Sequence, residues 1–127
     1  MMTPEDIKLL RQDPDGLATY EYLANHIDDC DDDLQQIVAN LVRVDLTGQF
    51  LASSARYLHA IDPEKYRDAV RELVAATIDK DREHRYLPDI LSAIYGPDYQ
   101  ANARTLSLTD DNFRRIYKRL FPNPEKL

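Results

Sequence analysis

The stretch that most constrains this fold runs from Leu34 to Ile61, because it is almost free of charge. It carries three charged residues in 28 positions, whereas 31% of the whole chain is charged. Charged side chains are rarely buried, so a long segment with so few of them belongs inside the protein. We therefore expect this segment to form the centre of the fold, with the other elements packed around it.

The apolar residues of this segment form two stripes, over 34–42 and 50–61. At about 100° per residue, the two stripes would point to nearly opposite sides of one straight helix. Such a helix would also be about 42 Å long, against a width of roughly 36 Å for a compact domain of this size. The sequence therefore predicts two helices, at about 32–44 and 47–60, with a corner at Asp45–Gly48.

The rest of the chain predicts further short helices. Asp13-Pro14-Asp15 and Asp62-Pro63-Glu64 each place an acidic cap before a proline, which is typical of a helix start. We expect an all-α fold, a compact irregular or orthogonal array of about six to eight short helices around the central pair. It should form a single helical domain over residues 1–127, with a frayed tail at about 123–127.

The two helix starts lie 49 residues apart and begin similar segments. Because the chemistry of a helix start explains the likeness by itself, we do not interpret it as an internal repeat. A helical-solenoid repeat is the less favoured alternative.

Charge and cysteine content bound the environment of the chain. The longest charge-free run covers ten residues, about half of what a membrane span requires, so we expect no membrane. A single cysteine and an N-terminus without an apolar signal region favour a cytoplasmic location. The net charge of −7 disfavours nucleic acid as a general partner, because phosphate binding depends on cations.

No motif for a catalytic site, a metal or a cofactor is present, and we expect none of them. The aspartates around Cys30 lack the glycine and glutamate that a calcium-binding EF-hand loop needs. Those carboxylates should raise the pKa of the Cys30 thiol, so we interpret Cys30 as a passive residue. The histidines His26, His59 and His84 lie far apart in the sequence and show no metal-binding spacing.

Two charged surfaces and one polar pocket remain as candidate sites. The candidate interaction surface consists of an acidic turn and a basic last helix; its residues are Asp28, Asp29, Asp31, Asp32, Asp33, Arg114, Arg115, Lys118 and Arg119. A candidate polar pocket on the second central helix uses Gln49, Arg56 and His59. Charged runs on helices are usually solvated faces, so each surface is a hypothesis.

The leading hypothesis for function is a protein-interaction module that binds a protein partner or a second copy of itself. It rests on the charge asymmetry, with net −8 over residues 1–62 and +1 over residues 63–127. The alternative is weak binding of nucleic-acid phosphates through the basic last helix. An enzyme with a pocket that the sequence does not reveal is the third and least favoured class.

Overall fold

The protein, described here by a computed structural model over residues 2–122, is all-helical. Within these residues the chain forms eight α-helices, one 3₁₀ turn and no strand. The elements are α1 (Pro4–Arg11), α2 (Leu17–Asn25), η1 (Asp31–Asp33), α3 (Leu34–Val44), α4 (Gln49–Ile61), α5 (Arg67–Lys80), α6 (Leu87–Tyr95), α7 (Ala103–Thr109) and α8 (Asp111–Leu120). The predicted all-α array of short helices is confirmed. The expected frayed tail at 123–127 lies outside the described residues.

The charge-poor segment forms two helices, α3 and α4, as the apolar stripes predict. The chain leaves helical geometry at Asp45 and re-enters it after Gly48, which has a φ of 91°. Both helices bury one stripe: Leu41 of α3 and Leu51 and Leu58 of α4 are fully buried. α3 contacts α1, α2, α4 and α5, and α4 contacts α2, α3, α5 and α6. The expected central pair of helices is therefore confirmed.

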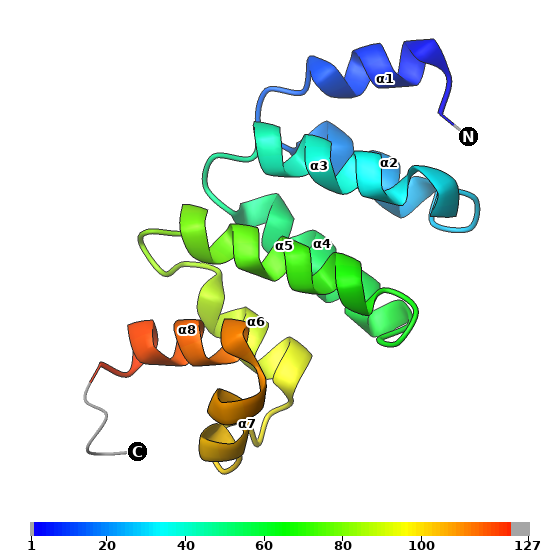
Figure 1. Cartoon of the computed structure of the whole chain (residues 1–127). Helices are drawn as coiled ribbons and strands as arrows, with labels where there is room; N and C mark the ends of the chain where they lie inside the picture. Colours follow the sequence, from blue (N-terminus) through cyan, green and yellow to red (C-terminus); the bar gives the residue numbers. More distant parts are fainter. Residues whose placement is uncertain (1, 123–127) are drawn as a thin grey trace.

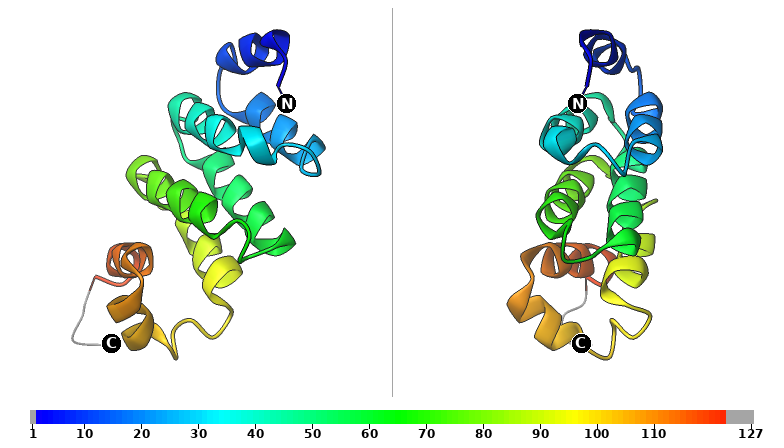
Figure 2. Two further views of the ribbon diagram at one scale, coloured as in Figure 1. Left: turned by 45° about the vertical axis from the view of Figure 1, so that its right-hand side comes forward. Right: turned by 90° about the vertical axis from the view of Figure 1, so that its right-hand side faces the viewer.

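The helices stack in two rows, which the views in Figures 1 and 2 show from three sides. One row contains α2, α4 and α6, and the other contains α3, α5 and α8, with α1 beside α3. From α2 to α6, each helix therefore packs on a helix two places along the chain as well as on its sequence neighbour, and α8 rather than α7 follows α5 in its row. This order resembles the arrangement of helical repeat proteins, in which a continuous core runs between the rows. α1 lies at one end of the stack, and α7 and α8 lie at the other.

A buried aspartate shapes the corner between α3 and α4. One oxygen of Asp45 accepts hydrogen bonds from the backbone N–H groups of Thr47 and Gly48, at 3.0 and 2.9 Å. The other accepts from the N–H groups of Phe50 and Leu51, both at 2.9 Å. The first N–H groups of a helix have no partner within the helix. Asp45 supplies that partner to the start of α4.

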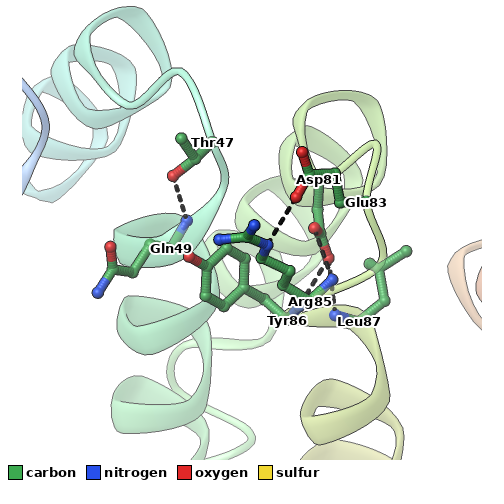
Figure 3. A network of polar contacts seen from close by, with 7 residues as sticks. All are labelled: Thr47, Gln49, Asp81, Glu83, Arg85, Tyr86 and Leu87. Carbon is green, nitrogen blue, oxygen red and sulfur yellow. Dashed lines mark hydrogen bonds and ion pairs between the residues drawn. The ribbon is translucent and has the colours of Figure 1, made fainter.

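The same device recurs at two more turns. Asp13 accepts hydrogen bonds from the backbone N–H of Gly16 at 2.9 Å and from that of Thr19, in α2, at 2.8 Å. Asp81 accepts from Tyr86 and Leu87 at the start of α6, at 2.8 and 2.9 Å, as Figure 3 shows. All three aspartates are buried. They begin the loops α1–α2, α3–α4 and α5–α6, which lie on one edge of the stack.

Glycines bring these turns into contact with one another. A Cβ placed on Gly16, whose φ is 108°, would lie 3.2 Å from the Cβ of Asp45. One placed on Gly48 would lie 3.3 Å from the Cβ of Asp81. The equivalent position of the third turn holds His84, with a φ of 56°. We call the series Asp13–Gly16, Asp45–Gly48 and Asp81–His84 the turn ladder.

Lys80 ties two steps of the turn ladder together. Its ammonium group donates to the carbonyl of Asp45 at 2.6 Å and to the carbonyl of Val42. These carbonyls lie at the C-terminal end of α3, where a cation is favourable because of the helix dipole. Burial lowers the pKa of Lys80, and the charge of Asp45 acts against that shift.

Candidate functional site

The stacking of α8 on α5 is incomplete. The side chain of Asn112, near the start of α8, donates to the carbonyl of Arg71 at 3.0 Å. Further along, the guanidinium of Arg115 pairs with Asp79 at 3.1 Å. The two helices therefore run in the same direction, and α8 starts beside Arg71. The first turn of α5 lies beyond the start of α8.

A groove of about 310 Å³ opens at this place, between α5, the end of α6 and the start of α8. Its floor is apolar, because it contains the buried Val70 and Val74 of α5 and the partly buried Ile94 of α6. The polar side chains around the floor are His59, Glu64, Arg67, Arg71, Tyr95, Asp110 and Asn112. An apolar floor with a few polar groups is the usual composition of a binding pocket. We call this feature the α5–α6 groove.

One wall of the groove is held by a hydrogen bond between Tyr95 and Asp110. The Tyr95 hydroxyl donates to Oδ1 of Asp110 at 3.1 Å, and the same oxygen accepts from the N–H of Phe113 at 3.0 Å. Burial, followed by the charge of Asp110 and this hydrogen bond, raises the pKa of Tyr95. Tyr95 therefore keeps its proton at neutral pH. The pair forms a fixed polar wall of the groove.

Arg67 and Arg71 provide the positive charge of the groove. They lie on successive turns of α5, and both are exposed. Neither makes an ion pair or a side-chain hydrogen bond with the part of the chain that the structure describes. Glu64 lies at the same rim and is also exposed. The two guanidinium groups are thus free to bind a carboxylate or a phosphate, for which their planar fork is suited.

The residues of the predicted polar pocket do not come together. Gln49 and Arg56 are exposed on α4, and neither lines the α5–α6 groove. Gln49 is the first residue of α4, and its N–H donates to Thr47 at 3.3 Å (Figure 3). His59 alone lines the groove. The structure thus groups His59 with Arg67 and Arg71, which we did not select from the sequence.

The acidic turn is partly engaged within the molecule. Asp28, Asp29 and Asp32 are exposed. Asp31 pairs with Lys65 of the neighbouring loop at 3.1 Å, which raises the pKa of Lys65. Asp33 is buried and accepts from the N–H of Met2 at 2.8 Å. As a binding surface the turn stays a prediction; four of its five carboxylates are exposed, and one of these, Asp31, already has a partner in Lys65.

Cys30 is buried beside this turn. Burial and the charges of Asp31 and Asp29 raise the pKa of its thiol. The predicted direction of this shift is confirmed, and it disfavours the thiolate that a nucleophile would need.

The basic face of α8 is also partly neutralised. Arg114 pairs with Asp111, and Arg115 pairs with Asp79 of α5. Lys118 and Arg119 are exposed near the end of the helix. The acidic turn lies between α2 and α3, on the other side of the stack in Figure 1. Within one molecule the two charged surfaces do not meet.

A signal for the groove is present in the sequence of α5. Arg67, Val70, Arg71 and Val74 follow one another at i, i+3, i+4 and i+7, so they share one face of the helix. The spacing predicts that Val70 and Val74 face the core, and it places the two arginines beside them on the same face. A basic residue repeated within an apolar stripe indicates a face that is only partly covered.

The fold and the groove together define an all-helical protein with two stacked rows of helices and a mainly apolar surface groove between α5, α6 and α8. Comparisons with family models, with curated proteins and with solved structures found no match for this chain. Over residues 2–122, no helix has the length and apolar character of a membrane span. The same residues contain no group of three or more His, Cys, Asp or Glu side chains that could hold a metal ion.

Proposed function

We propose that this chain is a protein-interaction module and that the α5–α6 groove is its binding surface. The observation that carries the proposal is the pair Arg67 and Arg71, exposed and unpaired beside an apolar floor. Arginine and buried apolar contacts supply much of the binding energy in protein interfaces. Stacked helices also provide a rigid surface for such contacts, as they do in helical repeat proteins.

The experiment is a comparison of three forms of the purified chain in a pull-down from a lysate of the source cells. They are the wild type, the double variant Arg67→Glu/Arg71→Glu, and the matched control Lys118→Glu/Arg119→Glu. Both variants change the net charge by the same amount, but only the first alters the groove. We expect a partner that the wild type and the control capture and the groove variant loses.

Sedimentation of the same three proteins at low and high salt tests self-association. A wild type that stays monomeric and captures no partner would contradict the proposed function. A partner that only the control variant fails to capture would indicate that the binding surface is α8 and not the groove.

Nucleic-acid binding through α8 is the alternative function proposed from the sequence. Arg114 and Arg115 already have acidic partners, so Lys118 and Arg119 would carry this binding. A mobility-shift titration at about 50 mM salt tests it, because phosphate contacts are strongest at low ionic strength. A shift that Lys118→Glu/Arg119→Glu abolishes would favour this alternative.

A further inference from the structure

The position of the α5–α6 groove in the stack indicates the shape of its ligand. α5 has 14 residues and α8 has 10, and α8 begins beside Arg71. The open part of α5 therefore includes its first turn, from Arg67 towards Arg71. In the row of α3, α5 and α8, each helix is covered by the next helix of the row. A short helical segment from outside would continue that packing.

A second depression extends the groove along α5. It has a volume of about 500 Å³ and shares Arg71, Asp110 and Asn112 with the α5–α6 groove. Its lining reaches Ala75 of α5. From Arg67 to Ala75 the two depressions cover about 12 Å of helix, at 1.5 Å per residue. A polypeptide segment fits such an elongated track better than a compact small molecule does.

The chemistry of the track sets the charge of the ligand. Three carboxylates also line the track: Asp110 accepts from Tyr95 and from the N–H of Phe113, Asp111 pairs with Arg114, and Glu64 is exposed at the rim. The cations Arg67 and Arg71 have no such partner among the described residues. They stand about one helical turn apart, as carboxylates at i and i+4 of a bound helix would. Between them lies the apolar floor.

We propose that the groove binds an acidic amphipathic helical segment of a partner protein. Its apolar side chains would lie on Val70, Val74 and Ile94, and its carboxylates would pair with Arg67 and Arg71. This inference rests on the proposed function as a protein-interaction module and adds the chemistry of the partner. Helix-in-groove binding of this kind is an established mode of peptide recognition.

The test uses a phage-displayed library of random peptides of about twelve residues, about 18 Å as a helix. The library is selected on the whole wild-type chain. We expect the enriched sequences to combine apolar residues with Asp or Glu at helical spacing. A synthetic, fluorescently labelled copy of an enriched peptide is then titrated against the wild type and the variants.

We expect Arg67→Ala/Arg71→Ala to bind the peptide with an affinity at least about tenfold lower than that of the wild type, because two charge-assisted contacts are lost. The control Lys118→Ala/Arg119→Ala should bind like the wild type. Arg67→Lys/Arg71→Lys keeps the charge but loses the planar fork, so it should fall between them. A peptide with lysine in place of its acidic residues should bind Arg67→Glu/Arg71→Glu better than it binds the wild type. Circular dichroism of each variant checks that it is folded.

Other results would overturn the inference in distinguishable ways. Enriched peptides without acidic residues, or peptides that Arg67→Ala/Arg71→Ala binds equally well, would reject this ligand while leaving a protein-interaction function in place. Enriched sequences similar to residues 28–34 of this chain, together with a dimer in sedimentation, would make a second copy the occupant. A library that yields no binding peptide would reject the inference. If the pull-down with the wild type also captured no partner, the proposed function would be rejected as well.

Discussion

The turn ladder and the α5–α6 groove differ in the burial and the partners of their charged residues. In the ladder, Asp45 is fully buried and each of its oxygens accepts two backbone hydrogen bonds. In the groove, Arg67 and Arg71 are exposed and have no partner among the described residues. A buried charge must be satisfied within the fold, whereas an exposed cation beside an apolar floor contributes little to folding. The contrast separates residues that hold the structure from residues available for binding.

The largest effect is expected from Asp45→Ala. Removing this carboxylate leaves four N–H groups without their acceptor at a buried helix start. We expect the free energy of unfolding to fall by about 3 kcal/mol, from the cost of a lost cap and unsatisfied buried donors. Urea denaturation followed by circular dichroism measures it.

The matched control is Asp62→Ala. Asp62 accepts from the N–H of Lys65 at 3.1 Å in an exposed turn outside the ladder. Water can replace that acceptor, so the loss should be smaller. Equal losses at Asp45 and Asp62 would contradict a special role for the ladder.

A smaller effect is expected from alanine at the ladder glycines. Gly48→Ala combines a left-handed backbone with a Cβ contact of 3.3 Å to Asp81. We expect a loss of about 2 kcal/mol in unfolding free energy. Gly16→Ala is the companion variant, because Gly16 is also left-handed, with a φ of 108°, and its Cβ would lie 3.2 Å from the Cβ of Asp45. It should cost a similar amount, and a cost of no more than about 1 kcal/mol at both glycines, the backbone contribution alone, would mean that the turns do not pack closely.

The sequence predicts the local part of this ladder and misses its continuity. The corner at Asp45–Gly48 follows from the phase of two apolar stripes, which is a property of neighbouring residues. The stacking of Gly16 on Asp45 joins turns 29 residues apart, and helical periodicity carries no information at that distance. In the sequence Asp13 resembles Asp62, because both precede a proline, but the structural equivalents of Asp13 are Asp45 and Asp81. His84 at the third glycine position hides the pattern further.

The groove is only partly predictable for a related reason. The face that Arg67 and Val70 share can be identified from the sequence of α5. Whether that face is covered depends on where α8 begins relative to α5, and this is set by the contact between Asn112 and Arg71. Such a contact arises from tertiary packing. The sequence can therefore identify the stripe but not its exposure.

A third test of the ladder uses the pH dependence of Asp13. Burial tends to raise the pKa of Asp13, but hydrogen bonds from Thr19, Gly16 and Asp15 outweigh it and leave the pKa lowered. A lowered pKa in the folded state stabilises the protein above the unfolded value of about 4, and this contribution is lost as the pH falls through the folded value. Asp13→Asn should therefore reduce the melting temperature at pH 7, and the difference from the wild type should shrink as the pH falls below about 4. A difference that stays constant down to pH 2.5 would show that the charge of Asp13 contributes nothing.

The smallest effect on stability is expected at the groove. Arg67→Ala/Arg71→Ala removes two exposed side chains that make no ion pair within the described residues, so the free energy of unfolding should change by no more than about 0.5 kcal/mol. Arg115→Ala is the comparison, because Arg115 is partly buried and joins α8 to Asp79 of α5. It should cost more than the double groove variant, because a partly buried arginine loses apolar contacts of its stem as well as its ion pair. Urea denaturation of both variants makes the test. If the groove variant lost more stability than Arg115→Ala, the two arginines would be structural, and the contrast between ladder and groove would fail.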